Sequence, residues 1–208
     1  MNDVNFSMVA NLAAIMPGYP FRGSIQPEVS GDALVVQMKD IAPEGGVDWS
    51  GTMRSELKGR KTPDWLCAGD VLVLARGTRF MAVCLDEPPA PAVCAPVFFH
   101  LRVQRAELDP AFLAWQINQP PCQRQLAQGA AGSLQLSITR PVLESLRVAV
   151  PPIARQRAMV GFAAAARRER HAMEQLIRNL ESQEQFLAED LHRAAEAAND
   201  SSERPDLT

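Results

Sequence analysis

Up to residue 151, apolar residues gather in short runs of the length and composition typical of β-strands. The runs lie between glycine, proline and aspartate residues, which favour turns. They span residues 33–38, 71–75, 79–85, 97–103, 134–138 and 147–150. The second and third runs are joined by Arg76, Gly77 and Thr78, so this pattern predicts an antiparallel hairpin. Residues 4–16 fit either a short helix or a strand.

Two short helices and one helical turn are predicted by capping residues and prolines. Asp109 can cap a helix that starts at Pro110, because a carboxylate accepts amide hydrogens of the first turn and proline fits there. We expect Pro120 and Pro121 to end this helix, and a second short helix to end near Gly129. Thr139 offers a cap for a helical turn over residues 142–146.

The pattern changes at Pro151 and Pro152, which end a strand and fit the first turn of a helix. Beyond them, apolar residues recur every three or four positions, as on one face of an α-helix. This apolar stripe includes Met173, Ile177, Leu180, Leu187 and Leu191. About 45 helical residues would span roughly 65 Å, more than the width of a small domain. We therefore expect the stripe to pair with another helix in a coiled coil or small bundle.

Together these patterns predict an α+β fold. A strand-rich domain is expected over residues 1–151, a long C-terminal helix over 152–198 and a disordered polar tail over 199–208. At 208 residues, the chain has room for one globular domain with an appendage. No apolar run approaches the ~20 residues of a membrane-spanning helix, and no signal-like segment begins the chain. The sequence therefore indicates a cytoplasmic protein without a membrane partner.

The charge distribution leaves binding to DNA open, although the formal net charge is −3. From Glu174 onward, nine acidic residues stand against three arginines, so residues 1–173 hold 18 basic and 15 acidic residues. The negative charge therefore belongs to the predicted helix and tail. Local positive patches, rather than net charge, drive the binding of phosphate groups.

No motif in the sequence indicates a catalytic or metal site. The cysteines at 67, 84, 94 and 122 are far apart and form no CxxC pair, so we expect buried free thiols rather than zinc ligands. His100 lies in an apolar run and is expected to be structural. The chain has no Asn/Asp-Pro-Pro-Tyr/Phe run, no GxxxxGK[ST] and no GxSxG. We therefore predict a protein that is not an enzyme.

Candidate DNA-binding residues lie in four loops. Arginine, lysine, asparagine and glutamine commonly contact base edges, and basic side chains bind phosphates. The candidates are Tyr19 and Arg22; Arg54, Lys58, Arg60 and Lys61; Arg76, Thr78 and Arg79; and Ser133 and Gln135. Each loop has a structural alternative. Tyr19 can pack its own loop, the basic residues can be solvated surface groups, and the glycines around the last pair can serve a tight connection.

The order and spacing of several short motifs resemble the specificity subunit of type I restriction–modification systems, in a form with one target recognition domain and one helical spacer. The motifs are Gly-Tyr-Pro-Phe at 18–21, Gly-Asp-Val-Leu at 69–72, Gly77, Gly-Ser-Leu-Gln at 132–135, Ile138, Val-Pro-Pro-Ile at 150–153 and Gln156. The resemblance extends from Val4 to about Leu191.

The resemblance implies a division of labour among subunits. The recognition domain of this family binds one half of a split DNA sequence, and its helices form an antiparallel coiled coil that docks methyltransferase subunits. Methyl transfer from S-adenosylmethionine to adenine occurs in the methyltransferase subunit. Nuclease activity, where present, belongs to a separate restriction subunit. For this chain, the family implies no cofactor of its own and partners that include double-stranded DNA and the methyltransferase.

A full specificity subunit carries two recognition domains and two spacers, whereas this sequence resembles one of each. The simplest expectation is a homodimer that pairs two copies of the helix 152–198 and binds inverted half-sites. One alternative is an interaction adaptor whose recognition domain has decayed. Another is a stand-alone hydrolase or nuclease.

Overall fold

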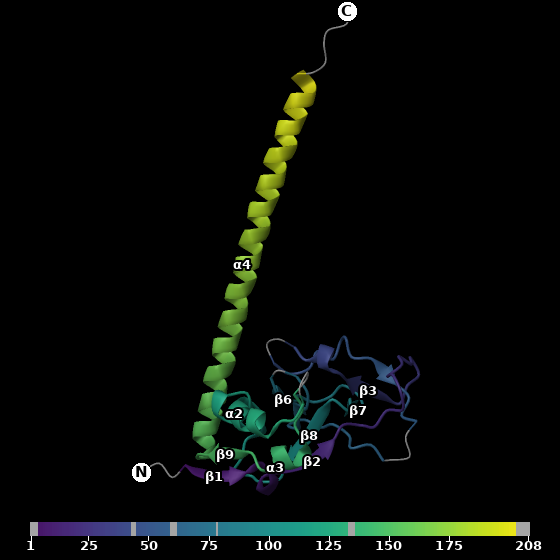
Figure 1. Ribbon diagram of the computed structural model, residues 1–208, viewed down its shortest axis with the longest axis vertical. Coiled ribbons are helices and arrows are strands. Elements are labelled where there is room, and N and C mark those ends of the chain that lie inside the picture. The colour runs from purple at the N-terminus through teal and green to yellow at the C-terminus, as the bar shows by residue number, and fades with distance from the viewer. Residues whose placement is uncertain (1–3, 43–44, 59–61, 78, 133–135, 203–208) are drawn as a thin grey trace, which may run out of the picture. The chain divides into compact units, whose positions relative to one another are not determined.

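The computed structural model describes residues 4–42, 45–58, 62–77, 79–132 and 136–202, with side chains up to residue 193. The chain divides into two compact units, Met1–Phe162 and Ala163–Thr208. The first unit contains the strands and short helices, and the second consists of helix wherever it is described (Figure 1). The α+β class predicted from the sequence is confirmed.

The strands of the first unit form three small sheets. The strands are β1 (Asn5–Met8), β2 (Ala13–Pro17), β3 (Ala33–Val36), β4 (Arg54–Ser55), β5 (Val71–Leu74), β6 (Ala82–Cys84), β7 (Ala92–Cys94), β8 (Phe98–Val103) and β9 (Arg147–Val150). Their orders are β2-β8-β5-β6, β4-β3-β7 and β1-β9. The predicted hairpin is confirmed, because β5 and β6 pair antiparallel with Val71 opposite Cys84. Of the predicted run 134–138, the described residues contribute isolated bridges at Ser137.

The α-helices of the described residues are α1 (Pro110–Ile117), α2 (Pro120–Gly129), α3 (Arg140–Glu144) and α4 (Ile153–Ser202), and short 3-10 helices lie at η1 (Val9–Asn11) and η2 (Met38–Asp40). The Asp109 carboxylate caps α1 as predicted, accepting the amides of Ala111 and Phe112 at 2.9 and 3.2 Å. Two details differ from prediction. Pro120 occupies the first turn of α2, because the first helical amides need no intrahelical partner. Thr139 precedes α3, but its side chain makes no capping hydrogen bond.

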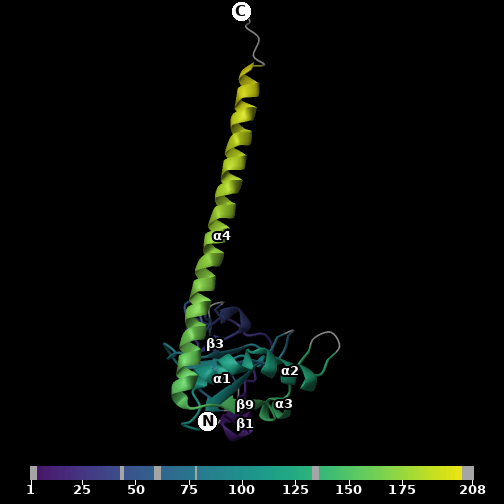
Figure 2. The same cartoon turned by 90° about the vertical axis from the view of Figure 1, so that its left-hand side faces the viewer.

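Two apolar cores lie on opposite faces of β5. Val71 and Val73 belong to the core that contains residues of α1, α2 and α3, whereas Leu72 and Leu74 pack with residues of β3 and β7. Successive side chains of a strand point to opposite faces, so β5 is buried on both sides. This explains its uninterrupted apolar sequence. The helices α1 to α3 are seen with β9 in Figure 2.

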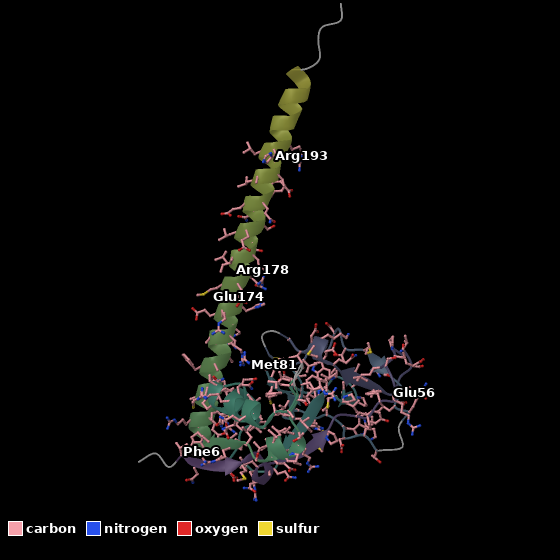
Figure 3. The ribbon with its side chains drawn as sticks, in the orientation of Figure 1. Phe6, Glu56, Met81, Glu174, Arg178 and Arg193 are labelled. Atoms are coloured by element: carbon pink, nitrogen blue, oxygen red, sulfur yellow. The ribbon has the colours of Figure 1, made fainter. Side chains whose placement is uncertain are left out.

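Helix α4 contains 50 residues and begins directly after Pro152. At 1.5 Å per residue it is about 75 Å long. The helix includes residues 199–202 of the expected tail, and residues 203–208 lie outside the described part of the chain. The side chains of the apolar stripe are 52–71% exposed in the single chain. Figure 3 draws the side chains of the described part of α4 as sticks and labels Glu174, Arg178 and Arg193 among them. Among the described helices, none has a stretch apolar enough to cross a membrane.

The start of α4 is fastened by a buried glutamine. The Gln156 side chain is fully buried and uses both ends of its amide. Its Oε1 accepts the Asp109 amide at 2.9 Å, and its Nε2 donates to the carbonyls of Glu107 and Pro151, each at 2.7 Å. These bonds join the first turn of α4 to the loop before α1. They satisfy backbone groups that would otherwise be buried without partners.

A charge network joins Asp70, just before β5, to β8, with Asp70 and His100 buried and Arg102 exposed. His100 Nε2 lies 2.7 Å from Asp70 Oδ2, and Arg102 donates to both carboxylate oxygens at 2.8 and 2.7 Å. Burial by itself raises the pKa of Asp70, but interactions with Arg102 and His100 outweigh it and lower this pKa to about 2. The buried position of His100 agrees with its expected structural role.

We predict that Asp70→Asn lowers the free energy of unfolding by about 2–4 kcal/mol at neutral pH, because it weakens a buried ionic network. The folded-state pKa of Asp70 lies below its ordinary value of 3.8. The stabilisation is therefore present above about pH 4 and is lost as the pH falls towards 2. Urea unfolding of both proteins over this range checks the effect. The exposed control Asp86→Asn should change stability by less than about 0.5 kcal/mol. Equal stability of wild type and Asp70→Asn at pH 7 would contradict the role of the network.

Candidate nucleic-acid interface

The candidate DNA-binding residues form two groups in the first unit. The first, here called the first-loop group, comprises Tyr19, Arg22, Arg54 and Lys58. The Tyr19 amide donates to the Cys94 carbonyl at 2.8 Å, which fixes the first loop to β7. The Glu28 amide donates to the Arg54 carbonyl at 2.9 Å, which bonds β4 to the same β2–β3 connection that carries Tyr19 and Arg22. Arg60 and Lys61 lie outside the described residues.

The basic side chains of the first-loop group are at the surface. Arg22, Arg54 and Lys58 are all exposed. Arg54 Nη1 makes one long hydrogen bond of 3.4 Å to the Gly31 carbonyl. Lys58 Nζ lies 3.1 Å from the Glu56 carboxylate, and both side chains are more than half exposed. Exposed ion pairs are weak, so these cations can exchange partners readily.

Tyr19 is buried, unlike the basic residues of its group. Its ring packs edge-on against Phe21 with ring centroids 4.9 Å apart, in a cluster with Val35. This burial favours the packing alternative for Tyr19. The preceding Gly18 explains why the loop reaches this position, because an added Cβ would lie 2.1 Å from the Ala95 carbonyl oxygen. Only glycine permits such a close approach of two backbones.

The second group, here called the hairpin group, comprises Arg76 and Arg79 in the loop between β5 and β6. This loop is bonded to the segment 136–138, which lies far away in the sequence. The Gly77 amide donates to the Leu136 carbonyl at 3.0 Å, and the Ile138 amide donates to the Ala75 carbonyl at 2.9 Å. The candidates Thr78, Ser133 and Gln135 lie outside the described residues.

The two arginines of the hairpin group differ in the contacts that their side chains make. Arg76 is exposed, and its side chain has no hydrogen bond or ion pair to any residue that the structure describes. Arg79 is also exposed, but its Nη2 donates to the Asn118 carbonyl at 3.1 Å, just after the end of α1. A cation is favourable at a helix C-terminus. Arg79 therefore has a structural role besides any contact with DNA.

One short turn connects the two groups. The carbonyl of Cys94 accepts the Tyr19 amide, and the carbonyl of Phe98 accepts the Gly18 amide at 3.0 Å. Within the same turn, the Val97 carbonyl accepts the Ala75 amide at 2.8 Å. The first loop and the hairpin loop are thus anchored to the same stretch of backbone.

An open pocket beside the first-loop group contains an aromatic residue that sequence reasoning missed. The pocket has a volume of about 690 Å³ and is lined by Asp32, Leu57, Pro63, Trp65 and Pro91. Trp65 is 39% exposed. An exposed aromatic ring next to basic residues can stack on a nucleic-acid base. The signal in the sequence was an aromatic residue two positions after Pro63, shortly after the basic cluster.

Three of the four cysteines have thiols that burial keeps protonated. Burial raises the pKa of Cys84 and of Cys122 to about 11 and that of Cys94 to about 12, so these thiols are protonated at neutral pH. Cys67 is exposed, which corrects the expectation of buried thiols, because it lies in the turn before β5. Among the residues with described positions, no cluster of three histidine, cysteine or acidic side chains could hold a metal ion.

Comparison with known proteins gives similarity at the level of structure. No family model matches the chain, and no curated protein matches it. A chain from a structure on complex assembly and conformational transition of the type I R-M system superposes with a TM-score of 0.61 and 18% sequence identity. That match covers 98% of this chain and 46% of the other.

The HsdS subunit from Thermoanaerobacter tengcongensis superposes with a TM-score of 0.55 and 17% identity, covering 80% of this chain and 39% of that subunit. The chain has the fold of a type I specificity subunit. The type I S subunit from M. genitalium matches with a TM-score of 0.49 and 14% identity, over 78% of this chain and 39% of the other. By the matches with TM-scores of 0.61 and 0.55, the chain spans less than half the length of the solved chains that it resembles. The resemblance drawn from short motifs is confirmed at the level of the fold.

We predict that the two hairpin arginines differ in their effects on stability. Arg79→Ala should lower the free energy of unfolding by about 1 kcal/mol, because it removes a charged donor from the carbonyl after α1. Arg76→Ala should change it by less than about 0.5 kcal/mol. Urea unfolding of the two variants checks this difference. Equal losses in both variants would show that Arg79 has no special structural contact.

Proposed function

We propose that this chain is a sequence-specific DNA-binding subunit of a type I-like restriction–modification system. The observation that carries the proposal is the hairpin group, in which basic residues stand on a loop bonded to a second loop from elsewhere in the sequence. Arginines on such a preorganised surface suit both phosphate contacts and bidentate contacts to guanine. The first-loop group adds exposed basic side chains to the same unit. The specificity-subunit fold supports this assignment.

We further propose that α4 pairs with a second copy of itself. The stripe from Met173 to Leu191 has spacings of four, three, seven and four residues, which match positions a and d of a heptad pattern. Each of its five side chains is more than half exposed in the single chain. Pairing two helices would remove this apolar surface from water. A two-fold dimer would present two recognition domains to a DNA target with inverted half-sites.

In this proposal, the chain recognises DNA and a partner carries out catalysis. The paired helices would dock a methyltransferase subunit, which would bind S-adenosylmethionine and modify adenine. A restriction subunit, where the system has one, would supply the nuclease. The protein would act in the cytoplasm, where bacterial DNA is found. Its own residues would determine which DNA sequence the complex engages.

We predict that the wild-type chain binds its preferred duplex, selected from a random library, more tightly than scrambled DNA at moderate salt. Arg76→Ala should weaken binding to the preferred duplex by about tenfold, because one arginine contact to a base or phosphate is lost. Gel-shift competition checks both statements. The control Arg193→Ala removes the same charge from the second unit and should have little effect. If wild-type affinity vanishes at physiological salt without sequence preference, specific recognition is excluded. Binding to a methyltransferase without DNA affinity would instead support the adaptor alternative.

We also predict that Leu180→Glu weakens dimerisation by at least about 2 kcal/mol, because it would bury a carboxylate in the helix interface. The variant should bind an inverted repeat no better than a single half-site, because a monomer engages DNA with only one recognition domain. Light scattering and gel shifts measure the two effects. The control Ser182→Glu adds the same charge off the stripe and should preserve the dimer. Unchanged mass and DNA affinity in Leu180→Glu would contradict pairing through this stripe.

A further inference from the structure

Two side-chain amides, from Asn118 just after α1 and from Gln123 in α2, hold the part of the hairpin loop that leads into β6. Gln123 Oε1 accepts the Phe80 amide at 3.1 Å, and its Nε2 donates to the Phe80 carbonyl at 2.9 Å. Asn118 makes the same pair of bonds to Ala82. Its Oδ1 accepts the Ala82 amide at 2.9 Å, and its Nδ2 donates to the Ala82 carbonyl at 2.6 Å. Each amide thus makes both hydrogen bonds that a residue of a neighbouring strand would make.

The position of these amides follows from the sheet. Strand β6 is the last strand of its sheet, so its outer side has no neighbouring strand. On its inner side, the Leu74 amide donates to the Met81 carbonyl, and Val83 lies opposite Leu72. Backbone groups alternate in direction along a strand, so those of Phe80 and Ala82 face outward. The corner between α1 and α2 therefore replaces the missing strand.

The corner that carries the amides is itself well fastened. Gln123 Nε2 also donates to the Ile117 carbonyl at 2.7 Å, which ties α2 to the end of α1. The Phe80 side chain is buried in the core that also contains Val71, Val73 and residues of α1 to α3. Arg79 immediately precedes this clamped residue, and its guanidinium bonds the Asn118 carbonyl at 3.1 Å. Both the backbone beside Arg79 and the end of its side chain are thus held by one corner.

We propose that Gln123 and Asn118 are positioning residues for DNA recognition. They hold residues 80–82 so that the hairpin arginines meet DNA in one orientation, a role that rests on the proposed function of this chain. A bidentate contact to a base requires a defined guanidinium geometry. A loop that is ordered before binding also avoids the entropic cost of ordering it in the complex. Non-specific attraction to phosphates depends on charge instead and needs little of this order.

The fold provides a matched control on the same helix. Gln125 Oε1 accepts the Arg147 amide at 3.1 Å, and its Nε2 donates to the Arg147 carbonyl at 3.2 Å. This is the same two-way contact, but it is made to β9, in a different sheet from the hairpin loop. Replacing Gln125 therefore removes an equivalent clamp without changing the support of residues 80–82.

The experiment compares Gln123→Met and Gln125→Met in competition binding with the preferred duplex and with scrambled DNA. Gln123→Met should reduce the ratio of the two affinities by about tenfold or more. Its affinity for scrambled DNA should change by less than about twofold, because no charge is altered. Gln125→Met should retain the wild-type ratio. Equal loss of the ratio in both variants, or its retention in Gln123→Met, would overturn the positioning role while leaving the proposed function intact.

A wild-type chain without sequence preference would overturn the proposed function and, with it, the positioning role. Amide hydrogen exchange tests the clamp without relying on the folding of a variant. In the wild-type chain, the Phe80 and Ala82 amides should exchange slowly despite their place on the outer side of β6. Gln123→Met should accelerate exchange at Phe80 by about tenfold or more and leave the Arg147 amide unchanged. Fast exchange at Phe80 and Ala82 in the wild-type chain would overturn the proposal.

Discussion

Exposed apolar surface along α4 is the constraint on which the proposed assembly depends. The stripe residues are 52–71% exposed in the single chain, and they recur with a heptad spacing. Full burial of one leucine or isoleucine side chain contributes about 1.5–3 kcal/mol. Several such side chains on one face therefore favour association strongly. In the proposed dimer, a second copy of the same helix would provide a complementary surface, and the two-fold arrangement would fit a DNA target with inverted halves.

Neutral amide side chains close the outer backbone edges of β6 and β9 in the first unit. Gln116 pairs with Ala149 through both its oxygen and its nitrogen, as Gln125 does with Arg147 in the same strand. Gln156 uses the same chemistry to secure the start of α4. One amide offers both a donor and an acceptor without the desolvation penalty of a buried charge. The edges at β6 and β9 are thus completed by side chains of α1, α2 and the corner between them.

Local signals in the sequence were sufficient to predict much of the fold. Short apolar runs predicted β3, β5 and β8, Asp109 predicted the start of α1, and the proline pair predicted the start of α4. The short strands β4 and β7 were missed, because two or three residues give no periodic pattern. The roles of Pro120 and Thr139 were also misjudged, since both depend on the geometry of the neighbouring turn.

The candidate interface was predictable only in part, because its order comes from contacts between distant segments. The hairpin pattern indicated the arginines at 76 and 79, but not the bonding of their loop to residues 136–138. Nothing near Tyr19 in the sequence distinguishes an exposed ring from the buried one observed. Trp65 was overlooked because its pocket is formed by residues from three separate segments. The amide clamps on Phe80 and Ala82 could not be predicted either, since they join residues that are 43 and 36 positions apart, respectively.

Sedimentation equilibrium of the wild-type chain, with and without an inverted-repeat duplex, tests the central claim most directly. The mass of one chain is 22.8 kDa. The account predicts twice this mass for the free protein over a broad concentration range, and two chains on each duplex. A single-chain mass at every concentration, with one chain on each duplex, would contradict it.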